Sequence, residues 1–112
     1  LYFDDIHHPL YEAESFEDID KGLQLPVMTD EEAAYLADRA KKLNEETPYA
    51  IIGTTSFIIF ERGFKDFGYE NYLMNLMTEQ EMVEYYLDKL VGAYIAFLDK
   101  YLDMVGDYIQ II

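Results

Sequence analysis

Cysteine and tryptophan are absent from this chain of 112 residues, and positive charge is scarce, with 8 lysines and arginines against 23 aspartates and glutamates. Without cysteine, neither disulfides nor thiolate metal sites can form within these residues. The formal net charge of −15 at pH 7 repels nucleic-acid phosphates and anionic lipid headgroups. We therefore expect no nucleic acid and no membrane among the partners.

Long uncharged runs are missing as well. No stretch approaches the roughly 20 apolar residues that cross a bilayer, and no basic leader precedes an apolar segment at the N-terminus. The composition is still that of a folded protein, because 51% of the residues are hydrophobic and 16% are aromatic. The sequence predicts a cytoplasmic chain that forms one small domain or part of a larger one.

A helix is predicted over residues 30–46. Thr29 and Glu32 have the spacing of a capping box, in which each side chain accepts the other residue's free backbone N–H. Small and aliphatic residues then recur at intervals of three and four, which indicates one buried face.

A longer helix is predicted over residues 79–105, where an apolar stripe keeps helical spacing for more than five turns. Thr78 and Glu81 repeat the capping-box pattern at its start, and Gly106 is placed to end it. A further helix is expected over 69–77.

Residues 1–28 are predicted to be an irregular lead-in. A short strand over 1–6 is one option, and residues 14–21 allow a short helix with Ser15 as its cap.

Two apolar segments are predicted to be strands. Residues 49–53 do not alternate in polarity, which is typical of a strand buried on both faces, and residues 107–112 follow the long helix. Helices between two strands form a βαβ unit whose strands are parallel neighbours, so the expected fold class is α/β. Residues 55–62 are predicted to form a short helix after the first strand, with a continuing strand as the competing interpretation.

Four motifs follow one another in an order and at a spacing typical of a known family. They are His8–Glu14 with Phe16–Ile19, Arg62–Met74, Thr78–Leu90 and Gly106–Ile109. Each is modest alone, but together they span nearly the whole chain and resemble the uroporphyrinogen decarboxylase superfamily.

The resemblance implies a (β/α)₈ barrel of about 250 residues or more. Residues 1–112 would be a central segment of that domain, a helix-rich βαβ slice of a TIM barrel with parallel strands near 49–53 and 107–112. The superfamily includes decarboxylases, lyases that remove carboxylates from the acetate side chains of a tetrapyrrole without a cofactor. It also includes methyltransferases that move a methyl group between a corrinoid and a thiol with the help of zinc.

The details around Arg62-Gly63 and Gly68-Tyr69-Glu70 look slightly closer to the methyltransferase branch. No tyrosine stands where the decarboxylases place a substrate-contacting one. The essential arginine, aspartate and late histidine of the decarboxylases have no counterpart here, and neither do the His-x-Cys zinc ligands of the methyltransferases. The resemblance therefore assigns no catalytic residue and no cofactor to this segment, and zinc or a corrinoid would belong to the rest of the parent enzyme.

Substrate-binding candidates lie where the predicted strands end, because barrel active sites form at the C-terminal ends of strands. The first strand end offers Gly53, Thr54 and Phe57, although the glycine could serve backbone clearance and the hydroxyls at 54–56 could cap the next helix. The second offers Gln110, whose side chain could bind substrate or a structural partner.

Arg62 is the cation best suited to the carboxylates of a tetrapyrrole, because a guanidinium can bind them in a bidentate manner. The alternative is a salt bridge to Glu61, Asp66 or Glu70. No metal site is predicted, since His7 and His8 point in different directions and zinc needs about three protein ligands.

An alternative function is a non-catalytic α/β module that binds a partner protein through sheet edges and an apolar face. For the 112-residue segment by itself we expect no catalysis, and we expect self-association through exposed apolar surface.

Overall fold

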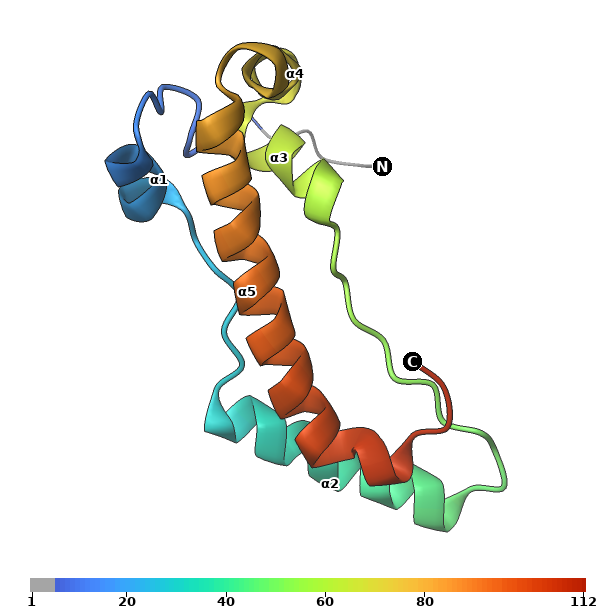
Figure 1. The fold of residues 1–112 in the computed structure, drawn as a ribbon. Coiled ribbons are helices and arrows are strands. Elements are labelled where there is room, and N and C mark those ends of the chain that lie inside the picture. Colours follow the sequence, from blue (N-terminus) through green and yellow to red (C-terminus); the bar gives the residue numbers. More distant parts are fainter. Residues whose placement is uncertain (1–5) are drawn as a thin grey trace. The chain divides into compact units, whose positions relative to one another are not determined.

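The computed structural model describes residues 6–112 and is dominated by helices (Figure 1). The predicted strand over 1–6 lies, apart from Ile6, outside the described residues. The helices are α1 (Phe16–Gly22), α2 (Asp30–Glu46), α3 (Ile59–Phe67), α4 (Tyr69–Thr78), α5 (Gln80–Val105) and the short 3₁₀ helix η1 (Gly106–Tyr108).

Local capping signals explain where the first two helices begin. The Ser15 hydroxyl accepts the Asp18 N–H at 3.2 Å at the start of α1. At the start of α2 the Thr29 hydroxyl accepts the Glu32 N–H at 3.1 Å, and the Glu32 carboxylate accepts the Thr29 N–H at 3.0 Å. Both predicted caps are confirmed. The Glu32 carboxylate also accepts the Thr29 hydroxyl at 3.0 Å. Because it accepts both the N–H and the hydroxyl of Thr29, the pKa of the Glu32 carboxyl lies below the ordinary value.

The two long helices and the helix predicted over 69–77 also form close to their predicted bounds. Thr78 does not have the capping position predicted for it at the start of the long helix. It is the last residue of α4, and its hydroxyl donates to the Met74 carbonyl at 3.1 Å. The helix predicted over 55–62 begins later, as α3 at Ile59.

The predicted α/β fold with strands over 49–53 and 107–112 is wrong. Among residues 6–112, the segments pair only at one parallel bridge, between Ile52 and Ile111. In Figure 1 the C-terminal end accordingly lies beside the segment that follows α2. The described residues therefore form helices without a sheet, and the TIM-barrel slice is not their fold.

The physical reason for this error is the number of strand partners. A parallel sheet is stable when helices cover both faces and further strands cover its edges. Among the described residues, each of the two short apolar segments pairs only with the other, and the first residues after α5 form η1. A non-alternating apolar run was therefore too weak a signal to predict a strand.

The chain divides into two compact units, each with its own core. The first unit contains the described residues up to Leu25 together with Ile58–Gly92, and the second contains Pro26–Phe57 and Ala93–Ile112. The helix α5 contributes its residues up to Gly92 to the first unit and the remainder to the second.

The core of the first unit consists mainly of aromatic and long aliphatic side chains: Leu10, Ile19, Phe67, Tyr72, Met82, Val83, Tyr86 and Leu90. The second unit buries a smaller set in which α2 contributes alanines: Met28, Ala33, Ala40, Tyr101 and Val105. None of the helices within residues 6–112 is both long enough and apolar enough to cross a membrane.

Candidate functional site

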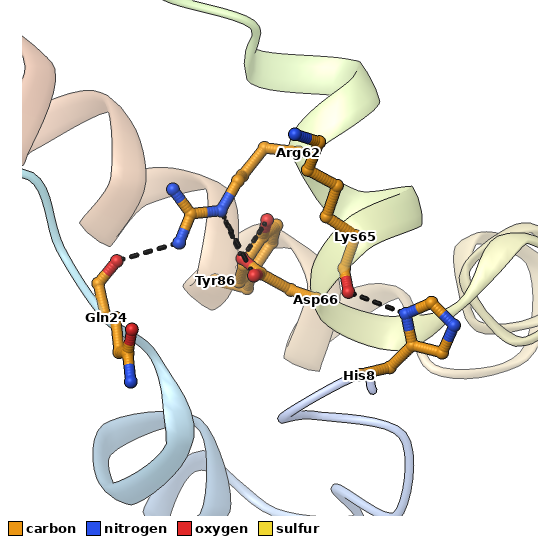
Figure 2. A network of polar contacts seen from close by, with 6 residues as sticks. All are labelled: His8, Gln24, Arg62, Lys65, Asp66 and Tyr86. Atoms are coloured by element: carbon orange, nitrogen blue, oxygen red, sulfur yellow. Dashed lines mark hydrogen bonds and ion pairs between the residues drawn. The ribbon is translucent and has the colours of Figure 1, made fainter. Parts of the chain in front are cut away.

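A buried polar network in the first unit contains Arg62, the predicted substrate-binding cation. Arg62 Nε donates to Asp66 Oδ1 and Oδ2, at 3.0 and 2.9 Å, one turn along α3. Tyr86 on α5 donates its hydroxyl to Asp66 Oδ2 at 2.9 Å, and Arg62 Nη2 donates to the Gln24 carbonyl at 2.9 Å. Figure 2 shows the arginine and the tyrosine directed toward the same carboxylate.

The electrostatics of this network keep Tyr86 protonated. Burial, followed by the adjacent negative charge of Asp66 and the hydrogen bond to it, raises the pKa of the Tyr86 phenol far above its ordinary value. Tyr86 therefore acts as a hydrogen-bond donor and not as a base. With 3% of its surface exposed, Asp66 is held between a cation and a donor, an arrangement that fixes α3 against α5.

The segment before α1 is fixed to α3 by two further contacts. His8 Nδ1 lies 2.7 Å from the Lys65 carbonyl, so Nδ1 carries the proton, because a carbonyl only accepts. The Leu10 N–H donates to the Asp66 carbonyl at 2.7 Å. Within residues 6–112 no group of three or more histidines and carboxylates could hold a metal ion.

Two predicted substrate-binding residues, Gly53 and Gln110, lie beside each other in the second unit. The Gly53 N–H donates to the Ile111 carbonyl at 2.8 Å, and the Gln110 N–H donates to the Ile51 carbonyl at 2.9 Å. Gln110 Oε1 also accepts the Ile51 N–H at 2.7 Å. The Gln110 side chain therefore has the structural partner that was one of its two alternatives.

Gly53 has little room for a side chain. A Cβ built on it would lie 2.7 Å from the Tyr101 hydroxyl and 2.8 Å from Ile109 Cδ1, which supports the interpretation of Gly53 as a residue of backbone clearance.

Thr54 and Phe57 differ in exposure. Thr54 is exposed, whereas Phe57 is half-buried, with its ring 4.7 Å from that of Tyr94 and 5.7 Å from that of Phe97. No side chain caps α3, which begins after Ile58, so the hydroxyls at 54–56 do not have the capping role considered for them.

The structure therefore brings Gly53 and Gln110 together and places Thr54 and Phe57 in the same unit, whereas Arg62 belongs to the other unit. The substrate-binding roles of these residues remain predictions.

The sequence analysis named Asp66 as one possible salt-bridge partner of Arg62, and the structure confirms this pair. It missed Tyr86. The spacing of Arg62 and Asp66, four residues apart, was a usable signal, since such pairs meet on one helix face. Tyr86 lies twenty residues from Asp66, and no local pattern links the two.

Tyr72 shows a second missed feature. Its ring is fully buried, its hydroxyl has no hydrogen-bond partner within the described residues, and burial raises the pKa of its phenol.

Comparison of the chain with models of protein families, with curated proteins and with solved structures finds no match.

Proposed function

We propose that this chain is a segment of an enzyme of the uroporphyrinogen decarboxylase superfamily, and that it forms part of a site for a tetrapyrrole or a corrinoid. The four motifs support the proposal, because their order and spacing are properties of the sequence whatever fold these residues adopt. The barrel is no part of the proposal, since residues 6–112 form no sheet.

The observation that carries the proposal is the parallel bridge between Ile52 and Ile111. It joins two segments that are far apart in the sequence and that contain or adjoin Gly53 and Gln110, two residues predicted to bind substrate. Gly53 and Gln110 become neighbours through it. Gln110 is exposed beside the buried Gly53, and its side-chain NH₂ group could donate a hydrogen bond to a ligand.

The network around Arg62 favours methyl transfer over decarboxylation. A tetrapyrrole with many carboxylates would have to compete with Asp66 for the guanidinium. The many neutral amides of a corrinoid place no such demand on a chain with a net charge of −15. The resemblance places the zinc ligands of a methyltransferase outside this segment.

The test uses the full encoded protein that contains this chain. We expect it to demethylate methylcobalamin in the presence of a thiol, which is followed by the absorbance of the corrinoid, or to convert uroporphyrinogen, which is followed by chromatography. Turnover in the first assay alone would select methyl transfer. Absence of turnover and of ligand binding in both would refute the proposal.

The variant Gln110→Glu sharpens this test. Glutamate keeps an oxygen that can accept the Ile51 N–H and adds a negative charge, so KM for a carboxylate-rich tetrapyrrole should rise by about tenfold, equivalent to roughly 1.4 kcal/mol. KM for a corrinoid should change less. Gln80→Glu adds the same charge at an exposed position and serves as the control.

A second candidate function, a helical interaction module, is favoured by exposed apolar side chains on α3 and α4. On α4 Met74 and Met77 are 62% and 79% exposed, and they share one helix face with Leu73. Phe60 on α3 and Tyr69 on α4 are also exposed. Such a surface is typical of a protein contact.

Self-association is the form of this function that the isolated chain can display. Sedimentation velocity at tens of micromolar should detect oligomers, and Met74→Gln with Met77→Gln should reduce them. Met104→Gln is the matched control, because Met104 is less exposed and lies outside this surface. A monomer at every concentration would exclude this form of the module.

A further inference from the structure

The helices α3 and α4 of the first unit pack against each other and leave a row of apolar side chains largely uncovered. On α4 the row follows one helix face, because its members stand four residues apart. On α3 the ring centroid of Phe64 lies 4.8 Å from that of Tyr69 and 5.2 Å from that of Phe60, so the row continues onto this helix. We call this surface the α3–α4 face, and its residues are Phe60, Phe64, Tyr69, Leu73, Met74 and Met77.

The shape and the side chains of this face suit a partner helix. The positions four apart on α4 match the apolar positions that recur at three and four along an amphipathic helix. Met74 and Met77 are 62% and 79% exposed, and the flexible thioether of methionine adapts to partner side chains of different shape. A partner strand would instead pair with the open edge of a sheet, and residues 6–112 form no sheet.

Carboxylates border the α3–α4 face. Glu61 on α3, Glu70 on α4 and Glu79 after the end of α4 are all exposed, and Glu70 lies one turn before Met74. Within residues 6–112 none of these three glutamates takes part in an ion pair. Lys65 is the one exposed basic residue of α3 and α4, so negative charge dominates the border of the face.

This border favours an occupant of positive charge. A second copy of the chain would bring the same carboxylates and a further net charge of −15, and like charges oppose its approach. Lysines or arginines beside the apolar stripe of a helix would meet the glutamates with opposite charge and speed the encounter. Self-association through this face is therefore the weaker of the two contacts.

We propose that the α3–α4 face binds an amphipathic helix of a partner protein whose apolar stripe is flanked by lysines and arginines. The stripe covers Leu73, Met74 and Met77, and the basic side chains pair with the glutamates of the border. The proposal rests on the interaction module, the second candidate function above, and names the class of its partner. It is independent of the tetrapyrrole or corrinoid site.

The experiment is an NMR titration of the ¹⁵N-labelled chain with a synthetic amphipathic peptide of leucines and lysines, about four helical turns long. We expect saturable binding with a Kd on the order of 10 μM, and the backbone signals of α3 and α4 should shift most. A peptide of the same composition without an apolar stripe measures attraction by charge alone and should bind about tenfold more weakly. A peptide with glutamate in place of lysine should not bind.

Matched variants locate the contact on the chain. Met74→Gln with Met77→Gln should weaken binding about tenfold, whereas Met104→Gln, the same change outside the face, should leave the Kd unchanged. Glu70→Gln should weaken binding about threefold, whereas Glu84→Gln, an equal charge change at an exposed position on α5, should not. Circular dichroism checks that each variant stays helical.

The outcomes separate this proposal from the function on which it rests. Equal binding of the two leucine–lysine peptides, or equal weakening by Met104→Gln and by the double variant, would overturn the proposal. Loss of oligomers in the double variant without binding of the striped peptide would keep the interaction module and refute the basic partner. Binding of the striped peptide by a chain that stays monomeric would support the basic partner and exclude only self-association.

Discussion

The cores of the two units of this chain consist of different kinds of side chain. The first unit buries the rings of Phe67, Tyr72 and Tyr86 completely and includes the carboxylate of Asp66 among them. In the second unit α2 packs against Tyr101 and Val105 of α5 through the small side chains of Ala33 and Ala40. Its ion pairs lie at the surface, as the pair of Lys100 and Asp30 does.

This difference predicts where substitutions will be costly. Side chains in the first unit have little room to rearrange, because a ring that moves collides with a neighbouring ring. A buried charge that loses its partner is also not solvated by water. Exposed ion pairs and helix caps contribute about 1 kcal/mol or less in most cases. We therefore expect the first unit to respond more strongly than the second to the loss of one polar contact.

The largest effect is expected for Asp66→Ala. The variant leaves the Arg62 guanidinium and the buried Tyr86 hydroxyl without their shared acceptor, so the free energy of unfolding should fall by about 3 kcal/mol. Urea denaturation measures this loss, and hydrogen exchange should quicken in α3 and α4 more than in α2.

Asp88→Ala is the control for that variant, because Asp88 is an exposed carboxylate of the same unit without an ion pair among the described residues. Equal destabilisation by the two substitutions would mean that the network adds no stability. The contrast between the units would then be wrong.

The next largest effect is expected for Gly63→Ala on α3. A Cβ there would lie 2.2 Å from Cζ of Tyr72, and Tyr72 cannot move aside because the ring of Phe67 stacks on it. Overpacking of this kind costs about 1–3 kcal/mol. Thermal unfolding of the variant measures the loss.

Gly92→Ala provides a matched control with the opposite sign. Nothing lies within 4 Å of the Cβ that would be added at Gly92, and alanine favours a helix over glycine by about 1 kcal/mol. Stabilisation by Gly92→Ala together with destabilisation by Gly63→Ala would locate the packing constraint at the contact between Gly63 and Tyr72, since both glycines belong to the first unit. Stabilisation by both would show that Tyr72 is free to move.

A smaller effect is expected in the second unit for Thr29→Ala. The substitution removes the hydroxyl that caps α2 and breaks its bond with Glu32, which should cost about 1 kcal/mol of unfolding free energy. Thr54→Ala, at an exposed threonine whose hydroxyl makes no hydrogen bond with the described residues, should cost less. A loss larger than that of Asp66→Ala would reverse the expected order of the units.

The sequence allowed the helices to be predicted because their signals are local. The caps at Ser15 and Thr29 and the stripe of α5 depend on residues within one or a few turns. The strands could not be judged in this way, since a strand depends on neighbours that its own residues do not specify. The candidate site shows the same difference between local and distant contacts. The pair of Arg62 and Asp66 could be predicted because the two residues are four apart on one helix. The contact between Tyr86 and Asp66 could not, because it joins separate helices.

The smallest effect is expected for Asp30→Asn, and it depends on pH. Hydrogen bonding from Lys100 and its positive charge hold the pKa of the Asp30 carboxyl below the ordinary value of 3.8. A carboxyl with a lowered pKa in the folded state adds stability above its unfolded pKa, and that stability is lost as the pH falls through the folded pKa. The difference in melting temperature between wild type and Asp30→Asn should therefore be present near pH 6 and should vanish well below pH 3.8. Because Asp30 is fully exposed, the difference should be smaller than that caused by Thr29→Ala, and about 1 M salt should reduce it. Asp103→Asn, an exposed aspartate on α5 without an ion pair among the described residues, should show no comparable change between these pH values. A difference for Asp30→Asn that persists in acid would mean that the aspartate acts through something other than its charge.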